Sequence, residues 1–163
     1  ASFFVMIYVL YAFRRLEKSY RFAISAVLTL IHDVVLVTGI YALFGHIFGL
    51  QVNSVFIVAL LTVIGYSVND TIVIFDRIRE NQIKFPDNKY SSNINISINE
   101  SIIRSLGTSI TTLLVLFSML ILGGSTLREF IVVLILGVVV GTYSSIFIAS
   151  QFLIIWEEGI KKD

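Results

Sequence analysis

Long apolar runs separated by shorter polar connections dominate the chain. Four runs approach or reach the roughly 20 residues that an α-helix needs to cross a hydrocarbon core about 30 Å thick. They are Phe22–Phe44, Ser54–Phe75, Ile102–Leu122 and Phe130–Trp156. Because lipid offers a peptide group no hydrogen-bond partner, each run is predicted to be a helix that satisfies its own backbone. The pattern predicts an all-α, polytopic transmembrane helix bundle.

A fifth apolar run, Ala1–Phe13, is shorter than the others. As a helix with a rise of 1.5 Å per residue it would cover only about 20 Å, which is too little to span a membrane. We interpret it as the end of a truncated first segment, which makes five membrane segments in all. A secretory signal is not favoured, because no basic residue precedes the run and no small-residue cleavage site follows it.

Composition supports the membrane interpretation and excludes several kinds of chemistry. The chain is 56% hydrophobic and 14% charged, and its mean hydropathy of +0.90 is far above that of a soluble domain. The net charge of +1 does not favour a nucleic-acid partner. There is no cysteine and there are only two histidines, so neither a metal site nor a catalytic triad is supported. We therefore expect no metal, no cofactor and no enzymatic activity.

The basic residues predict how the helices are oriented. The connections Gly45–Asn53 and Gly123–Glu129 carry only Arg128 between them, whereas the alternate connections are rich in Lys and Arg. Since positive residues stay on the cytoplasmic side, the basic connections and the C-terminus are predicted to be cytoplasmic. The residues on that side are Arg14, Arg15, Lys18, Arg21, Arg77, Arg79, Lys84, Lys89, Lys161 and Lys162.

The segment 76–101 is polar, contains Pro86, and is predicted to be a cytoplasmic loop. Within it Ile94, Ile98 and Ile102 recur every fourth residue. This spacing is typical of an amphipathic helix that leads into the next span. A flexible linker is the alternative.

Asp70 is an ionisable side chain inside an apolar run, about 7.5 Å from the predicted cytoplasmic end of its span. Placing such a group in a membrane costs roughly 2.5 to 3.5 kcal/mol, so its presence indicates a role. Thr62, Tyr66, Ser67 and Asn69 fall on the same side of the helix. This polar face must avoid lipid.

Arg104 enters the next span from the cytoplasmic end. Because the two spans are antiparallel, Asp70 and Arg104 are expected at similar depths, and we predict that they form an ion pair. The guanidinium favours an ionised carboxylate, whereas loss of water favours a neutral acid, so separating the two would promote proton uptake by Asp70. The alternative is a pair that only fastens two helices together. The polar and small residues on the same side of this span are Gly107, Thr108, Thr111 and Ser118.

A supporting polar network is predicted around this pair. His32 and Asp33 lie near the middle of their span, where they could relay protons or make purely structural contacts, and the sequence leaves both open. The hydroxyl groups could equally be interhelical hydrogen bonds worth about 0.6 to 2 kcal/mol each. The predicted members are Tyr66, Ser67, Asn69, Thr71, Thr108, Thr111, His32 and Asp33.

The last span carries small residues at intervals of four, namely Gly137, Gly141, Ser145 and Ala149. Such a stripe lets two helix backbones approach closely. We predict a packing role and favour a partner helix within the same chain over one from another subunit.

The segment 59–81, ALLTVIGYSVNDTIVIFDRIREN, resembles the signature of the SecF family of protein-export membrane subunits. The segment 98–112, INESIIRSLGTSITT, is similar to the segment that follows in that family, and 141–150, GTYSSIFIAS, is similar to its final span. His32 and Asp33 also fit the family pattern. Ser105 departs from it, because threonine is expected after the arginine; both residues are hydroxyls.

The resemblance implies a membrane half with a fold similar to that of the resistance-nodulation-division (RND) transporters. It implies a multi-pass protein of the bacterial cytoplasmic (inner) membrane, with a first helix and a large extracytoplasmic domain preceding this segment. The family's essential acid maps onto Asp70 and its arginine onto Arg104. The implied partners are SecD, the SecYEG channel, YajC, membrane lipid and exported polypeptides, with protons as the coupling ion and no nucleic acid.

Two other functions share some of these features. An RND-type proton-driven exporter of small molecules or lipids would also have polar faces on its membrane helices, but it normally carries both membrane halves in one polypeptide. A passive scaffold that only anchors partner subunits would not need Asp70 to titrate.

Overall fold

The structure is a computed structural model that describes residues 7–9, 11, 19–49, 51–124 and 127–159. Within these residues the chain forms helices and no strands, which confirms the predicted all-α class. The elements are α2 (Ser19–Phe48), α3 (Ser54–Lys84), α4 (Tyr90–Leu122), α5 (Arg128–Ser144), the π-helical η2 (Ser145–Ala149) and α6 (Ser150–Glu158).

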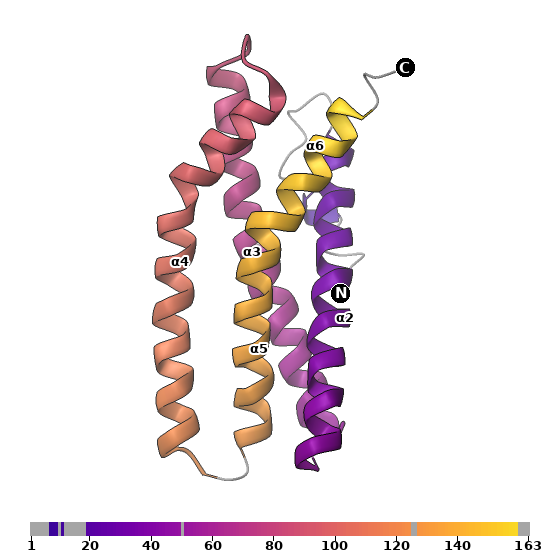
Figure 1. Ribbon diagram of the computed structural model, residues 1–163, viewed down its shortest axis with the longest axis vertical. Coiled ribbons are helices and arrows are strands. Elements are labelled where there is room, and N and C mark those ends of the chain that lie inside the picture. The colour runs from indigo at the N-terminus through magenta and orange to yellow at the C-terminus, as the bar shows by residue number, and fades with distance from the viewer. Residues whose placement is uncertain (1–6, 10, 12–18, 50, 125–126, 160–163) are drawn as a thin grey trace.

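The long helices run alternately up and down along one common direction (Figure 1). The turn between α3 and α4 lies at one end of the bundle, and the connection from α4 to α5 lies at the other. Four helices of the described part are long and apolar enough to cross a membrane. Their bounds are Tyr20–Ile47, Ser54–Lys84, Tyr90–Leu122 and Arg128–Trp156. Most of the predicted truncated segment 1–13 lies outside the described residues, and 7–9 are helical.

The segment 76–101 differs from the predicted loop, because α3 and α4 continue through most of it and only 85–89 are not helical. Ile78 and Ile94 are fully buried on the facing sides of the two extensions, and this apolar contact maintains both helices. Pro86 explains where α3 ends, since the residue before a proline is forced out of the helical region. Phe85 accordingly has φ −127° and ψ 67°.

The small-residue face of α5 packs directly on α3. A Cβ atom added at Gly137 would lie 2.0 Å from Cγ2 of Val63, and one added at Gly141 would lie 3.1 Å from Cβ of Ser67. Ser145 continues the same stripe and is fully buried. The helix against which the stripe packs therefore belongs to this chain, and the glycines allow the two backbones to approach.

Candidate functional site in the membrane core

Asp70 of α3 is 8% exposed and its two carboxyl oxygens have different surroundings. Oδ1 accepts a hydrogen bond of 2.8 Å from Oγ of Ser105 on α4. Oδ2 is buried and has no hydrogen-bond partner among the described residues. A buried acceptor without a donor is unfavourable, more so when it is charged, so this oxygen is the part of the core that is most ready to gain a proton or a new partner.

The predicted ion pair between Asp70 and Arg104 is not formed in the structure, in which both residues are described. Successive residues on a helix point about 100° apart, and α4 turns Ser105, not Arg104, toward Asp70. Arg104 is exposed on the neighbouring face. Both residues nevertheless line one cavity of about 110 Å³. The other lining residues are Tyr66, Asn69, Val73, Ser105 and Thr108.

A second buried acid, Asp33 of α2, connects three helices. Its Oδ2 accepts hydrogen bonds from Oγ of Ser67 on α3 and from Oγ of Ser144 on α5, the latter at 2.8 Å. Its Oδ1 lies 3.1 Å from Nδ1 of His32. Asp33 is 2% exposed and both of its oxygens have partners, so it acts as a hydrogen-bonding hub. Sequence analysis did not select Ser144, although it lies within the segment 141–150 that carries the family resemblance.

Hydroxyl groups extend the polar core from α3 to α4 and α5. The Tyr66 hydroxyl lies 3.1 Å from Oγ of Ser109, which in turn lies 2.6 Å from Oγ1 of Thr142. Oγ1 of Thr71 lies 2.8 Å from Oγ of Ser145. Sequence analysis missed Ser109 and Thr142. Ser109 lies four residues after Ser105, and this helical spacing was the available signal.

Three predicted members of the network make no hydrogen bond to another helix in the described part of the chain. Thr108 and Thr111 donate to carbonyl oxygens of α4 itself, at 2.9 and 3.0 Å. Asn69 is exposed and contributes to the cavity wall. These side chains, together with Arg104, leave a polar strip on the outer face of α3 and α4.

The backbone of the last span changes geometry next to this core. The N–H of Ser145 is shared between the carbonyl oxygens of Gly141 and Thr142, and the five residues that follow Ser144 form the π-helical η2. In Figure 1, α6 leans away from the axis of α5 beyond this point. Single π turns inside helices are frequent at functional sites. No residue pattern in the sequence predicted this change of helix geometry.

No group of three His, Cys, Asp or Glu side chains gathers as a metal site in the part of the chain that the structure describes. The chemistry available in this core is therefore that of two carboxyl groups, one imidazole, one guanidinium and several hydroxyls. Such a set can hold and pass protons.

The family model described as "Protein export membrane protein SecD/SecF, C-terminal" matches residues 1–159 of the chain. The chain belongs to this SecD/SecF family. Protein translocase subunit SecF of Thermobaculum terrenum is 44% identical over 157 residues, which are 96% of this chain and 50% of that protein. Protein translocase subunit SecF of Sebaldella termitidis is 47% identical over 153 residues, 93% of this chain and 47% of that protein.

A fused form is also similar to this SecD/SecF family member. Protein translocase subunit SecDF of Thermus thermophilus is 41% identical over 153 residues, 94% of this chain and 20% of that protein. The crystal structure of SecDF in its super-membrane-facing form has a TM-score of 0.88 and 40% identity, covering 99% of this chain and 21% of that one. The polar core therefore lies within the part shared with SecDF. The chain spans about half the length of the SecF relatives.

Proposed function

We propose that this chain is the membrane half of a SecF-type translocase subunit that uses the proton motive force to promote protein export. It acts with SecD and the SecYEG channel, with YajC as a further partner, in the bacterial cytoplasmic membrane. Its C-terminus lies in the cytoplasm, and exported polypeptides meet a part of the subunit outside this chain. The observation that carries the proposal is Asp70, which is buried in an apolar helix and has one carboxyl oxygen without a hydrogen-bond donor among the described residues.

Proton binding at Asp70 is the coupling step in this proposal. A proton taken up by Oδ2 neutralises the buried charge, and its release on the other side of the membrane restores it. Moving one charge through a membrane potential provides about 2.3 kcal/mol per 100 mV, which is enough to shift a conformational equilibrium substantially. No other coupling ion and no cofactor is invoked.

Arg104 balances the charge of Asp70 when the proton has left. It lines the same cavity but forms no pair with Asp70 in this structure, and its long side chain can swing across the cavity wall. We assign the present arrangement to the separated state and the predicted ion pair to the state in which Asp70 is ionised.

A larger cavity of about 580 Å³ supports proton release to the cytoplasmic side. It lies at the end of α3 and α4 that carries Arg77, Arg79 and Glu100, and it shares Val73 and Arg104 with the cavity around Asp70. These two side chains separate a charged, open space from the buried acid. Arg104 therefore lies where it can control the release of the proton from Asp70.

The polar strip on the outside of α4 supports SecD as a direct partner. Arg104, Thr108 and Thr111 are exposed along this helix, and an arginine facing lipid is costly. A protein partner with polar groups would remove that cost. The fused SecDF relative agrees with this assignment, because it carries both names in one chain.

The test is Asp70→Asn in the full-length subunit, assembled with SecD and SecYEG in proteoliposomes. The amide keeps the shape and the bond to Ser105 but cannot titrate. Export stimulated by an imposed proton gradient should fall to the level measured without a gradient. Asp87→Asn, the same change at an exposed position of the turn 85–89, is the matched control and should leave export unchanged. Gradient-stimulated export by Asp70→Asn at the wild-type level would refute the proposal.

A further inference from the structure

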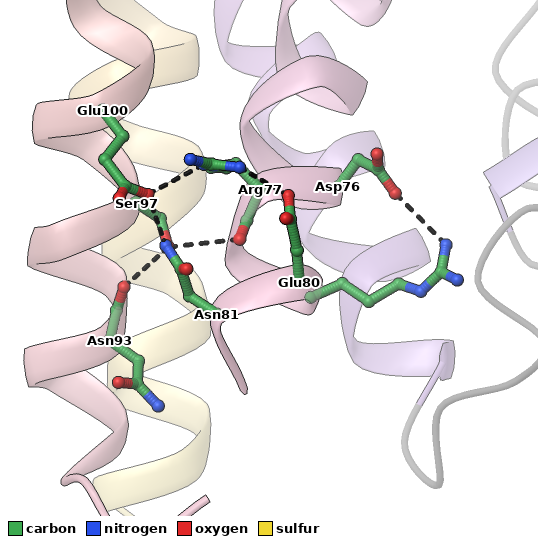
Figure 2. Close-up of polar contacts among 8 residues, drawn as sticks. Asp76, Arg77, Glu80, Asn81, Asn93, Ser97 and Glu100 are labelled. Carbon is green, nitrogen blue, oxygen red and sulfur yellow. Dashed lines mark hydrogen bonds and ion pairs between the residues drawn. The ribbon is translucent and has the colours of Figure 1, made fainter. Parts of the chain in front are cut away.

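A second polar cluster joins α3 to α4 near the turn 85–89, away from the apolar middle of the helices (Figure 2). Its centre is Asn81 of α3, which is 2% exposed. The Nδ2 group of Asn81 donates to Oγ of Ser97 at 3.0 Å and to Oε2 of Glu100 at 2.7 Å, both on α4. One short amide therefore bonds to α4 at two positions almost one helical turn apart.

Arg77, one turn before Asn81, strengthens the same connection. Its Nε lies 2.8 Å from Oε2 of Glu100, the oxygen that Asn81 also contacts. Oγ of Ser97 lies 3.3 Å from the backbone carbonyl oxygen of Arg77. Figure 2 shows Arg77 reaching across to Glu100, with Asn81 pointing to Ser97 beside it. We call Arg77, Asn81, Ser97 and Glu100 the clasp.

Asn93 closes the turn next to the clasp. Its Nδ2 group donates to the carbonyl oxygen of Phe85 at 2.8 Å, and its Oδ1 accepts from Asn88 at 3.1 Å. Asn93 and Ser97 are both fully buried. Buried polar side chains cost free energy unless every group has a partner, and here they bond across two helices in one specific alignment.

The clasp and the Asp70–Ser105 hydrogen bond connect the same two helices. Neither α3 between residues 70 and 81 nor α4 between residues 97 and 105 is interrupted, so each transmits its position as a rod. A slip of one residue between the helices shifts them by about 1.5 Å and turns the contact face by about 100°. Such a slip would remove Ser105 from Asp70.

We infer that the clasp positions the proton-binding site: by locking the register of α3 and α4, it keeps Ser105 bonded to Asp70 and Arg104 on the neighbouring face. Asn81, Arg77 and Glu100 are thus positioning residues for Asp70, and Arg77 and Glu100 also line the larger cavity, so the surroundings of Asp70 are measured as well as export. The consequence for export rests on the function proposed above. The expected effect on the surroundings of Asp70 does not depend on that function.

Charge exchange tests this inference. Arg77 also pairs with Glu80 on its own helix, so the exchange is made in the Glu80→Gln background, which should leave the surroundings of Asp70 unchanged. In that background Arg77→Glu and Glu100→Arg each place like charges or an unpaired charge in the clasp, whereas the double exchange restores the ion pair between α3 and α4 in reverse. The Asn81 amide can turn over and offer its oxygen to the new arginine. Lys89→Gln is the control, because it removes one positive charge from an exposed side chain of the turn 85–89, outside the clasp.

The readout is the infrared band of the Asp70 carboxyl group in the full-length subunit with its partners, identified as the band lost in Asp70→Asn. Ser105→Ala shows where this band lies without the hydrogen bond. Both single clasp variants should move the band to the Ser105→Ala position, and the double variant should return it to the wild-type position. Gradient-stimulated export should fall about fivefold in each single variant and recover in the double variant.

Bands at the wild-type position in both single variants, with Ser105→Ala displaced, would overturn the inference. The inference would also be overturned if the band of the double variant stayed at the position seen in the single variants. Failure of the proposed function looks different, because Asp70→Asn would then export normally while the band still reports on the clasp. Lys89→Gln should match the wild type in both measurements.

Discussion

At the scale of single residues, the two buried acids of the core differ in how completely their oxygens are bonded. Asp33 has partners for both oxygens, on three helices. Among the described residues, Asp70 has a hydrogen-bond partner for Oδ1 only. Since an acid whose two oxygens already have hydrogen-bond partners gains little from changing its surroundings, we assign Asp33 to structure and Asp70 to proton exchange.

This assignment predicts opposite outcomes for the same substitution. In Asp33→Asn the single oxygen can accept from both Ser67 and Ser144, as Oδ2 does now, and the amide can donate to His32. Gradient-stimulated export should therefore stay near the wild-type level, in contrast to Asp70→Asn.

Asp33→Ala supplies the complementary measurement. It leaves the serine hydroxyls without their acceptor and should lower the free energy of unfolding by about 1 to 3 kcal/mol, measured by denaturation in detergent. A loss of export in Asp33→Asn without a loss of stability would instead make Asp33 part of the proton path.

At the scale of the elements, the contact between α3 and α5 depends on the absence of side chains. A Cβ at Gly137 would lie within 2.7 Å of three atoms of the Val63 side chain. Gly137→Ala should therefore force the helices apart and lower the free energy of unfolding by about 1 to 3 kcal/mol. Gly39→Ala on α2 is the control, because nothing lies within 4 Å of its added Cβ.

Compensation checks the geometry of this contact. Val63→Ala removes Cγ1 and Cγ2, two of the three atoms that the new methyl group would meet, and leaves Cβ, so adding it to Gly137→Ala should recover part of the lost stability. Thermal unfolding of the two single variants and the double variant measures this coupling. Purely additive losses would show that the two helices do not meet at this point.

The sequence predicted the spanning helices because their apolar length is set by the membrane, and it predicted the acid because charge is rare there. It did not predict the helical extensions around Asn81 and Asn93, because Asn and Ser are typical of loops until they are buried together. The spacing of Ile94, Ile98 and Ile102 was the one local sign of helix. Whether Ser105 or Arg104 faces Asp70 depends on the rotation of α4 about its axis. Packing of α4 against α5 and α3 determines that rotation.

At the scale of the whole molecule, the helices are unequally covered. In its most apolar 18-residue window, the span that contains α5 is 56% buried inside the chain, whereas α4 is 17% buried. Most of α4 therefore faces lipid or another protein. Its polar strip is the part of the helix for which contact with lipid is least favourable. The chain spans about half the length of its SecF relatives, and on the function proposed above we expect SecD to cover the strip.

Cysteine cross-linking distinguishes these surroundings. A cysteine at Thr111, on the polar strip of α4, should cross-link to a helix of SecD in the assembled full-length complex. A cysteine at Val35 of α2, which is 65% exposed and apolar, should stay uncross-linked and react with a lipid-soluble alkylating reagent whether or not SecD is present. Reaction of the Thr111 cysteine with that reagent should be slow only in the complex, because a protein partner excludes the reagent from the strip. Equal reaction rates with and without SecD would mean that the strip faces lipid or the subunit's own first helix, and Arg104 would then have to reach the membrane surface to find water.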